Sequence, residues 1–179
     1  MSLITEDGSV VTGAESYASV DYADNYFSLR EIDTWAALSP AAQEAALRLA
    51  TEYMTQRYRS QWQGLRVSAS QELDWPRDYV YLDPVAAIVP TGMLEYSNLV
   101  PNDIVPEPVK KVCSELALRA STSDLWADLT QGVTREKVGQ IEVEYDRASP
   151  QRTRYPAIDA MLAPYLKSGS GLNMGLVRC

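Results

Sequence analysis

The feature that most constrains the fold is one alternating stretch in a chain that is otherwise typical of helices and loops. In REKVGQIEVEYDR, residues 135–147, the apolar Ile141, Val143 and Tyr145 alternate with acidic residues, which is the period of a half-buried β-strand. A lone strand leaves backbone N–H and C=O groups unpaired, so this strand requires a partner. Two partners are open at this point: the other arm of a hairpin that turns near Gly139, or an adjacent subunit.

The remaining sequence predicts a mainly α fold, a small helical bundle. The clearest helix begins in SPAAQEAALRLATEY, where Ser39 is suited to the N-cap and Pro40 to the first helical position. Leu49 and Tyr53 are expected on its apolar stripe. A second helix, PEPVKKVCSELALRA, has apolar residues at the i, i+3, i+4, i+7 spacing of a core helix. The elements are expected near residues 19–30, 40–60, 107–121 and 156–166 for the helices and 134–146 for the β element.

A long irregular loop is predicted for residues 65–105. Five prolines between residues 76 and 106 are too closely spaced for a long helix. Loops of this length are usually functional or packed on a partner, and Trp75 and Tyr79 offer amphipathic area for such packing. The expected organisation is a single domain over residues 16–166, a flexible N-terminal arm over 1–15 and a flexible C-terminal tail over 167–179.

The residues needed for common catalytic and metal sites are missing. The chain has no histidine and two cysteines, Cys113 and Cys179, at unrelated positions. Glu142, Glu144 and Asp146 project from one face of a strand, where successive side chains lie roughly 6 to 7 Å apart and do not converge on one ion. We therefore expect no enzyme, no metal and no cofactor, and expect these three acids to face water or a channel.

Charge is unevenly distributed in a chain of net charge −8. Residues 1–146 carry 11 basic and 23 acidic side chains, whereas residues 147–179 carry five basic and one acidic. An acidic body repels a phosphate backbone, while a basic tail suits docking on a copy of the same chain or on another acidic protein. The sequence contains neither a long apolar run nor a secretion signal, so we expect no membrane partner and synthesis in the cytoplasm.

Five segments resemble, in this order, a phage protein family labelled DnaT-like single-stranded-DNA-binding. They are SYASVDYADNYFSLR, AALRLATEYMTQRYRSQWQGLRVSASQELDWPR, VPEPVKKVCSELALRA, REKVGQIEVEYD and RYPAIDAMLAPYL, and the parts QELDWPR and EKVGQIEVEYD are the most specific. The family also looks like the helical head-to-tail adaptor, or head-completion, proteins that dock beneath the portal of tailed phages. The resemblance covers nearly the whole chain.

What the resemblance implies is a virion protein that forms a ring at the head-to-tail interface, with about twelve copies expected. Its partners would be itself, the portal, a downstream tail protein and double-stranded DNA that passes through the channel without specific binding. The residues expected at contacts with a neighbouring subunit or the portal are Ile141, Val143, Tyr145, Arg152, Arg154, Leu172, Met174, Leu176, Trp75 and Tyr79.

Two functions follow as hypotheses. The first is a structural head-to-tail adaptor, in which the strand, the long loop and the tail find partners in the ring. The second is a replication accessory protein that binds single-stranded DNA, as the family label states. The second function requires a basic groove with stacking aromatic residues, and the acidic balance of residues 1–146 disfavours it.

Overall fold

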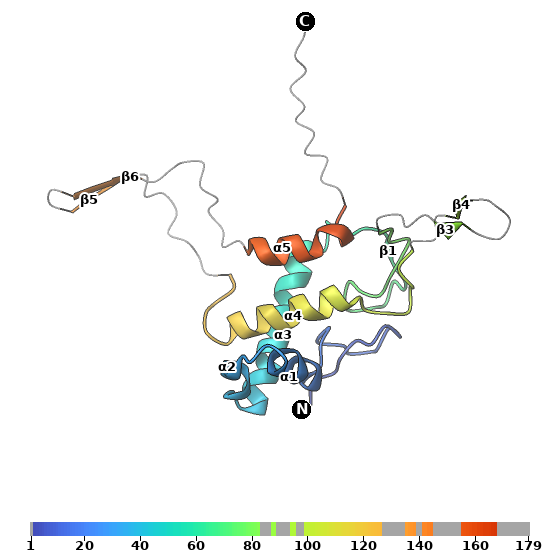
Figure 1. Cartoon of the computed structure of the whole chain (residues 1–179), viewed down its shortest axis with the longest axis horizontal. Helices are drawn as coiled ribbons and strands as arrows, with labels where there is room; N and C mark the ends of the chain where they lie inside the picture. The colour runs from blue at the N-terminus through green and yellow to red at the C-terminus, as the bar shows by residue number, and fades with distance from the viewer. Residues whose placement is uncertain are drawn as a thin grey trace, which may run out of the picture.

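The computed structural model describes residues 2–82, 87–88, 94–95, 99–126, 135–138, 141–144 and 155–167 of the chain (Figure 1). Within these residues, helices form the body and the strands form three two-stranded sheets. The expected mainly α fold class with a small β-hairpin is therefore confirmed.

Helix α3 (Pro40–Tyr58) is the axis of the body. Its start is the predicted one, because the Ser39 hydroxyl accepts a hydrogen bond of 3.3 Å from the N–H of Ala42 and Pro40 is the first helical residue. Leu49, which we expected on the buried stripe, is 51% exposed. The buried face is displaced around the helix from the predicted one, so that Leu47 is fully buried instead.

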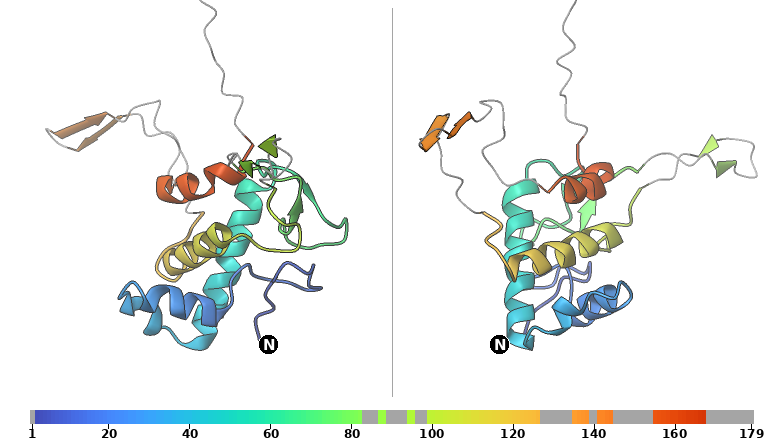
Figure 2. Two further views of the ribbon diagram at one scale, coloured as in Figure 1. Left: turned by 45° about the vertical axis from the view of Figure 1, so that its right-hand side comes forward. Right: turned by 60° about the vertical axis from the view of Figure 1, so that its left-hand side comes forward.

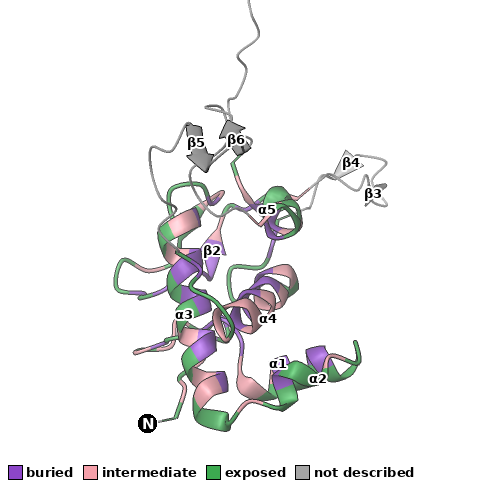
Figure 3. Ribbon diagram, turned by 90° about the vertical axis from the view of Figure 1, so that its left-hand side faces the viewer, coloured by how far each residue is buried: buried purple, intermediate pink, exposed green. Residues whose placement is uncertain are grey.

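Helix α4 (Glu107–Ala120) packs across α3 and makes the largest contact between helices of the body. The face that it turns to α3 is buried, as Figure 3 shows by colour. This face has the spacing that predicted a core helix, and its members are Val109, Val112, Cys113, Leu116 and Ala117.

The other helices lie at the two ends of α3 (Figures 1 and 2). Helices α1 (Val20–Ser28) and α2 (Asp33–Ala36) lie at its N-terminal end, with Ser19 as the N-cap of α1. Helix α5 (Pro156–Leu162) lies toward its C-terminal end and continues into a 3₁₀ turn, η1 (Ala163–Tyr165). The tighter turn coincides with Pro164, which cannot donate a backbone hydrogen bond to an α-helix.

The strands form three antiparallel pairs: β1 (Leu65–Arg66) with β2 (Arg77–Asp78), β3 (Ala87–Ile88) with β4 (Leu94–Glu95), and β5 (Arg135–Val138) with β6 (Ile141–Glu144). The first two pairs fall inside the stretch that we expected to be irregular throughout. Each of these strands has two residues, which is too short to produce an alternating pattern in the sequence.

The N-terminal segment is held on the body, which corrects the expectation of a free arm over residues 1–15. Its Glu6 side chain is 2% exposed and accepts hydrogen bonds from the N–H groups of Gly8 (2.8 Å), Val10 (3.0 Å) and Val11 (2.9 Å). The Glu6 N–H itself donates to the carbonyl of Ser16 at 2.8 Å. One buried carboxylate thus organises the segment through backbone contacts, which leave no periodic signal in the sequence.

The core predicts a simple contrast between two leucines. Leu116 on α4 is fully buried, so Leu116→Ala is expected to lower the free energy of unfolding by about 2 to 5 kcal/mol. Leu49→Ala is the matched control, because Leu49 is 51% exposed and its truncation is expected to cost less than about 0.5 kcal/mol. Urea denaturation followed by circular dichroism measures both. Equal losses for the two variants would contradict the buried face assigned to α3 and α4.

Candidate functional site

Two stretches of the chain that contain a pair of strands are each bounded by a contact between described residues of the body. At the first contact, residues 81 and 99 form an antiparallel bridge, and the N–H of Val100 donates to the carbonyl of Val80 at 2.9 Å. The chain between them contains β3 and β4, which pair with each other. We call this contact of Tyr81 with Leu99 the first neck.

The second contact is an aromatic cluster on α3. The ring of Tyr53 lies 4.7 Å from the ring of Trp126 and 5.8 Å from the ring of Tyr155, measured between centroids. Trp126 follows α4, Tyr155 precedes α5, and the chain between them contains β5 and β6. The Arg119 guanidinium also lies 5.7 Å from the Tyr155 ring centroid. We call this cluster the second neck; it fixes both ends of the segment that carries the hairpin.

The register of β5 and β6 answers which partner the alternating strand has. Arg135 lies opposite Glu144, Lys137 opposite Glu142, and the whole ladder joins two strands of one chain. Of the two partners left open by the sequence, the same-chain hairpin is therefore the one present.

The structure describes some of the residues predicted at contacts or in a channel and leaves others outside the described part of the chain. Ile141, Val143, Glu142 and Glu144 belong to the backbone of β6. Seven others, which lie outside the described residues, are Tyr145, Asp146, Arg152, Arg154, Leu172, Met174 and Leu176. The structure thus joins the β6 residues to one hairpin, and a role in contacts or in a channel stays a prediction for all of them.

Trp75 and Tyr79, four residues apart, lie in opposite environments. Trp75 is fully buried, with its ring 5.6 Å from that of Trp62 and 5.8 Å from that of Tyr165, so the prediction that it lies at an interface is wrong. Tyr79 is 57% exposed and Tyr81 is 56% exposed, both beside the first neck. An aromatic residue is as suitable for a core as for an interface, and the sequence alone does not separate the two.

The stretch QELDWPR has a structural role at the junction of several segments. The Arg77 guanidinium is buried and donates to the carbonyl oxygens of Gln63 (2.6 Å), Gly64 (2.8 Å) and Asp74 (3.0 Å). The Asp74 carboxylate accepts from Nε of Arg59 at 3.0 Å. Arg77 and Asp74 together therefore hold the end of α3, the following turn and β2 in place.

The same stretch holds the N-terminal segment. The N–H of Asp74 donates to the hydroxyl oxygen of Tyr17 at 2.9 Å, and the Glu72 carboxylate accepts from the N–H groups of Gly13 (2.6 Å) and Ala14 (3.1 Å). Burial, and then the charge of Asp74, raises the pKa of the Tyr17 hydroxyl, which keeps it neutral. The motif therefore has a clear role in holding the fold together.

Two features are absent from the described part of the chain. No group of three or more His, Cys, Asp or Glu side chains there is placed to hold a metal ion. No helix there is long and apolar enough to cross a membrane.

The buried Asp74 predicts a pH dependence of stability. Burial raises the pKa of Asp74, and the neighbouring Arg59 opposes that shift only in part, so the folded protein binds this proton more tightly than the unfolded chain does. The contribution of Asp74 to stability is thus largest below about pH 4 and is lost as the pH rises through the folded-state pKa.

Asp74→Asn is expected to remove this contribution, so the difference in unfolding free energy between the wild type and the variant should become less favourable to the wild type as the pH rises above about 4. Urea denaturation at a series of pH values measures it. Asp21→Asn, at an exposed carboxylate on α1, is the control. A difference that stays constant with pH would show that Asp74 ionises with equal ease in the two states.

Comparison with known proteins places the chain in a family. Neither the curated proteins nor the solved structures include a match to it. A family model matches residues 1–179, so the chain belongs to the family described as "Putative DnaT-like ssDNA binding protein".

Proposed function

We propose that the chain is a structural protein of a tailed-phage virion, a head-to-tail adaptor that forms a ring beneath the portal. The observation that carries the proposal is the pair of hairpin-bearing segments, each anchored to the helical body at a neck. A two-stranded hairpin has two unpaired edges and is at best marginally stable alone. Pairing or packing with a neighbouring subunit would satisfy those edges.

The body supports the same proposal through its charge. Residues 1–146 carry about twice as many acidic as basic side chains, 23 against 11. A ring of such subunits would offer DNA a channel that repels phosphate, which suits passage during packaging and ejection better than retention. In this proposal the protein is not an enzyme, binds no cofactor, and contacts the portal on one side and a tail protein on the other.

The hairpin provides the test of assembly. Val143 lies opposite Glu136 in the β5–β6 register, and a proline there lacks the N–H and the backbone freedom that a strand pair requires. Val143→Pro is expected to reduce the copies incorporated into virions by about tenfold or more, a loss of at least ~1.4 kcal/mol in assembly. Quantitative mass spectrometry of purified particles, complemented with each variant, measures it.

Val143→Thr is the matched control, since threonine keeps the N–H and the β propensity, and it should assemble normally. Circular dichroism checks that the helical body of both variants is intact. Absence of the wild-type protein from purified particles would contradict the adaptor proposal. Normal incorporation of Val143→Pro would show that the hairpin is not needed for assembly.

The second candidate function is binding of single-stranded DNA, which the family description favours. In the structure, the observation on its side is the pair of exposed rings at the first neck, Tyr79 and Tyr81. Exposed aromatic rings are the platforms on which unpaired bases stack. One observation speaks against DNA binding. The guanidinium of Arg30 lies 3.6 Å from the ring centroid of Tyr26, so this cation already has a partner within the body.

A titration separates the two functions. With a fluorescent oligothymidine at low salt, the adaptor proposal expects no binding tighter than about 100 µM. Binding at about 1 µM or tighter that weakens steeply with added salt would favour the second candidate. Tyr81→Ala should then lower the affinity and Tyr81→Phe, which keeps the ring, should retain it.

A further inference from the structure

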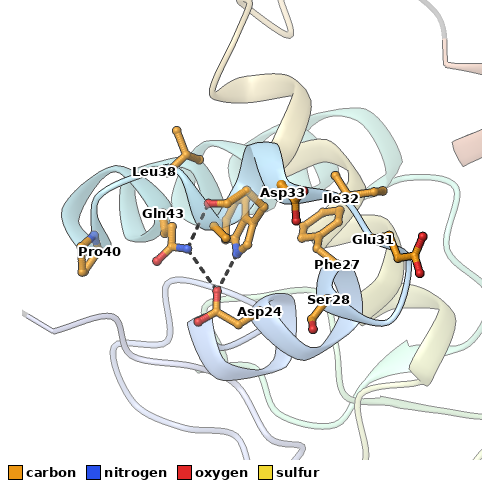
Figure 4. A pocket seen from close by; sticks show the side chains of 11 residues that line it. Asp24, Phe27, Ser28, Glu31, Ile32, Asp33, Leu38, Pro40 and Gln43 are labelled. Carbon is orange, nitrogen blue, oxygen red and sulfur yellow. Dashed lines mark hydrogen bonds between the residues drawn. The ribbon is translucent and has the colours of Figure 1, made fainter.

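A cavity of about 790 Å³ opens between α1, α2 and the first turn of α3 (Figure 4). Its apolar base is formed by the rings of Phe27 and Trp35, each 1% exposed, which lie 5.2 Å apart between centroids. Ile32 and Leu38 add partly buried apolar surface to the lining. The cavity therefore offers aromatic and aliphatic contact to a side chain that enters it.

Hydrogen bonds within the cavity already occupy the side-chain donors of Trp35 and Gln43. Asp24 Oδ1 accepts hydrogen bonds from Trp35 Nε1 at 2.7 Å and from Gln43 Nε2 at 3.1 Å, and the same Gln43 nitrogen donates to the carbonyl of Trp35 at 3.3 Å. Because both groups facing that nitrogen are acceptors, the orientation of the Gln43 amide is determined by chemistry. Its oxygen receives no hydrogen bond from the described residues, although the side chain is 6% exposed.

The charge of the cavity is negative. Glu31 and Asp33, both exposed, line it together with Asp24, and none of the lining residues in the described chain is basic. A ligand that fits must supply hydrogen-bond donors, positive charge and a flat face for the aromatic base. The guanidinium of an arginine has all three, with five N–H donors on a plane that stacks on aromatic rings.

We propose that this cavity binds Arg178, from the C-terminal segment 168–179 of a second copy of the chain. Arg178 follows Leu176 and Val177, whose apolar side chains suit the Ile32 and Leu38 rim. The charges favour the contact, because Arg178 is the one charged side chain of residues 168–179 and the charged residues that line the cavity are the acids Asp24, Glu31 and Asp33.

The position of Lys167, the residue before the tail, favours the cavity of a neighbouring subunit. Lys167, the last described residue, is fixed at the C-terminal end of α3, where its N–H donates to the carbonyl of Gln61 at 2.7 Å and its Nζ to that of Ser60 at 3.2 Å. The cavity lies at the opposite end of α3, beside Pro40 and Gln43 (Figures 1 and 4). At 1.5 Å per residue, the 19 residues of α3 separate the two by about 28 Å.

At about 3.5 Å per residue, the eleven residues from 168 to 178 would reach the cavity of their own chain only in a largely extended conformation. In the proposed ring, the cavity of a neighbouring subunit does not impose this requirement, so the proposal assigns the tail to that cavity. A contact between the α5 end of one subunit and the α1–α2 end of the next is head-to-tail, and contacts of this kind close into rings when the rotation permits. The inference thus rests on the proposed ring and identifies one of its contacts.

Cys179 offers a direct test, because it adjoins Arg178. Cys113 is fully buried and burial raises the pKa of its thiol, so a maleimide reagent should modify Cys179 selectively. Full-length chains carrying a benzophenone maleimide are mixed with isotopically heavy, unmodified chains at about 1 mM, which populates contacts with a Kd near 1 mM. After irradiation, mass spectrometry locates the cross-links and the isotope pattern separates links between chains from links within one.

The expected result is a link between chains that maps to residues 24–43. Arg178→Glu, or the double variant Glu31→Arg with Asp33→Arg, should lower its yield by about tenfold, as for the loss of one charge-assisted contact of ~1.4 kcal/mol. Mixing Arg178→Glu chains with the double-variant chains should restore the link by exchanging the charges. Glu52→Arg, at an exposed acid on the middle of α3, is the matched control and should leave the yield unchanged.

Links that map elsewhere, links confined to one chain, or a yield unaffected by the cavity variants would each overturn the inference. Electron microscopy of the same wild-type protein with the portal distinguishes a failure of the cavity contact from a failure of the proposed function. Rings without the predicted link contradict only the cavity contact, whereas the absence of rings and of the protein from virions contradicts the proposed function itself.

Discussion

The body depends on one buried cation. Arg77 places a guanidinium, 6% exposed, among the carbonyl groups of Gln63, Gly64 and Asp74, all of which lack regular secondary-structure partners there. Buried carbonyl oxygens left without donors would cost free energy comparable to lost hydrogen bonds, and the fork of the guanidinium satisfies three at once. Gly64 lets the backbone of Asp78 come close at this junction. Its φ is +63°, and a Cβ there would lie 2.0 Å from the Asp78 carbonyl oxygen.

Every segment that crosses this junction is thereby held relative to α3. Tyr17 and Glu72 connect the N-terminal segment to it, and β2 leads from it to the first neck. The second neck depends on α3 by another route, through the ring of Tyr53. The two hairpin-bearing segments consequently begin from points of one helical body.

Sequence reasoning succeeded where local chemistry determines structure. Ser39 and Pro40 mark the start of α3 through capping and fixed backbone geometry, and α4 follows from the spacing of its apolar residues. It failed where contacts distant in the chain decide. The N-terminal segment is ordered by Glu6, a single carboxylate with no periodicity, and Trp75 is buried by partners at positions 62 and 165. The necks and the α1–α2 cavity likewise arise from residues far apart in sequence, and no local pattern announces them.

The two necks also make the stability of the helical body largely independent of the length of the two segments that they bound. Because the bridge of Tyr81 with Leu99 and the rings around Tyr53 fix both ends of each segment, added residues affect the fold mainly through the entropy of loop closure. That cost grows with the logarithm of length, about 0.6 kcal/mol for each doubling. Either segment could therefore change in length while the same helical body is retained, so the body and the two segments are free to vary separately.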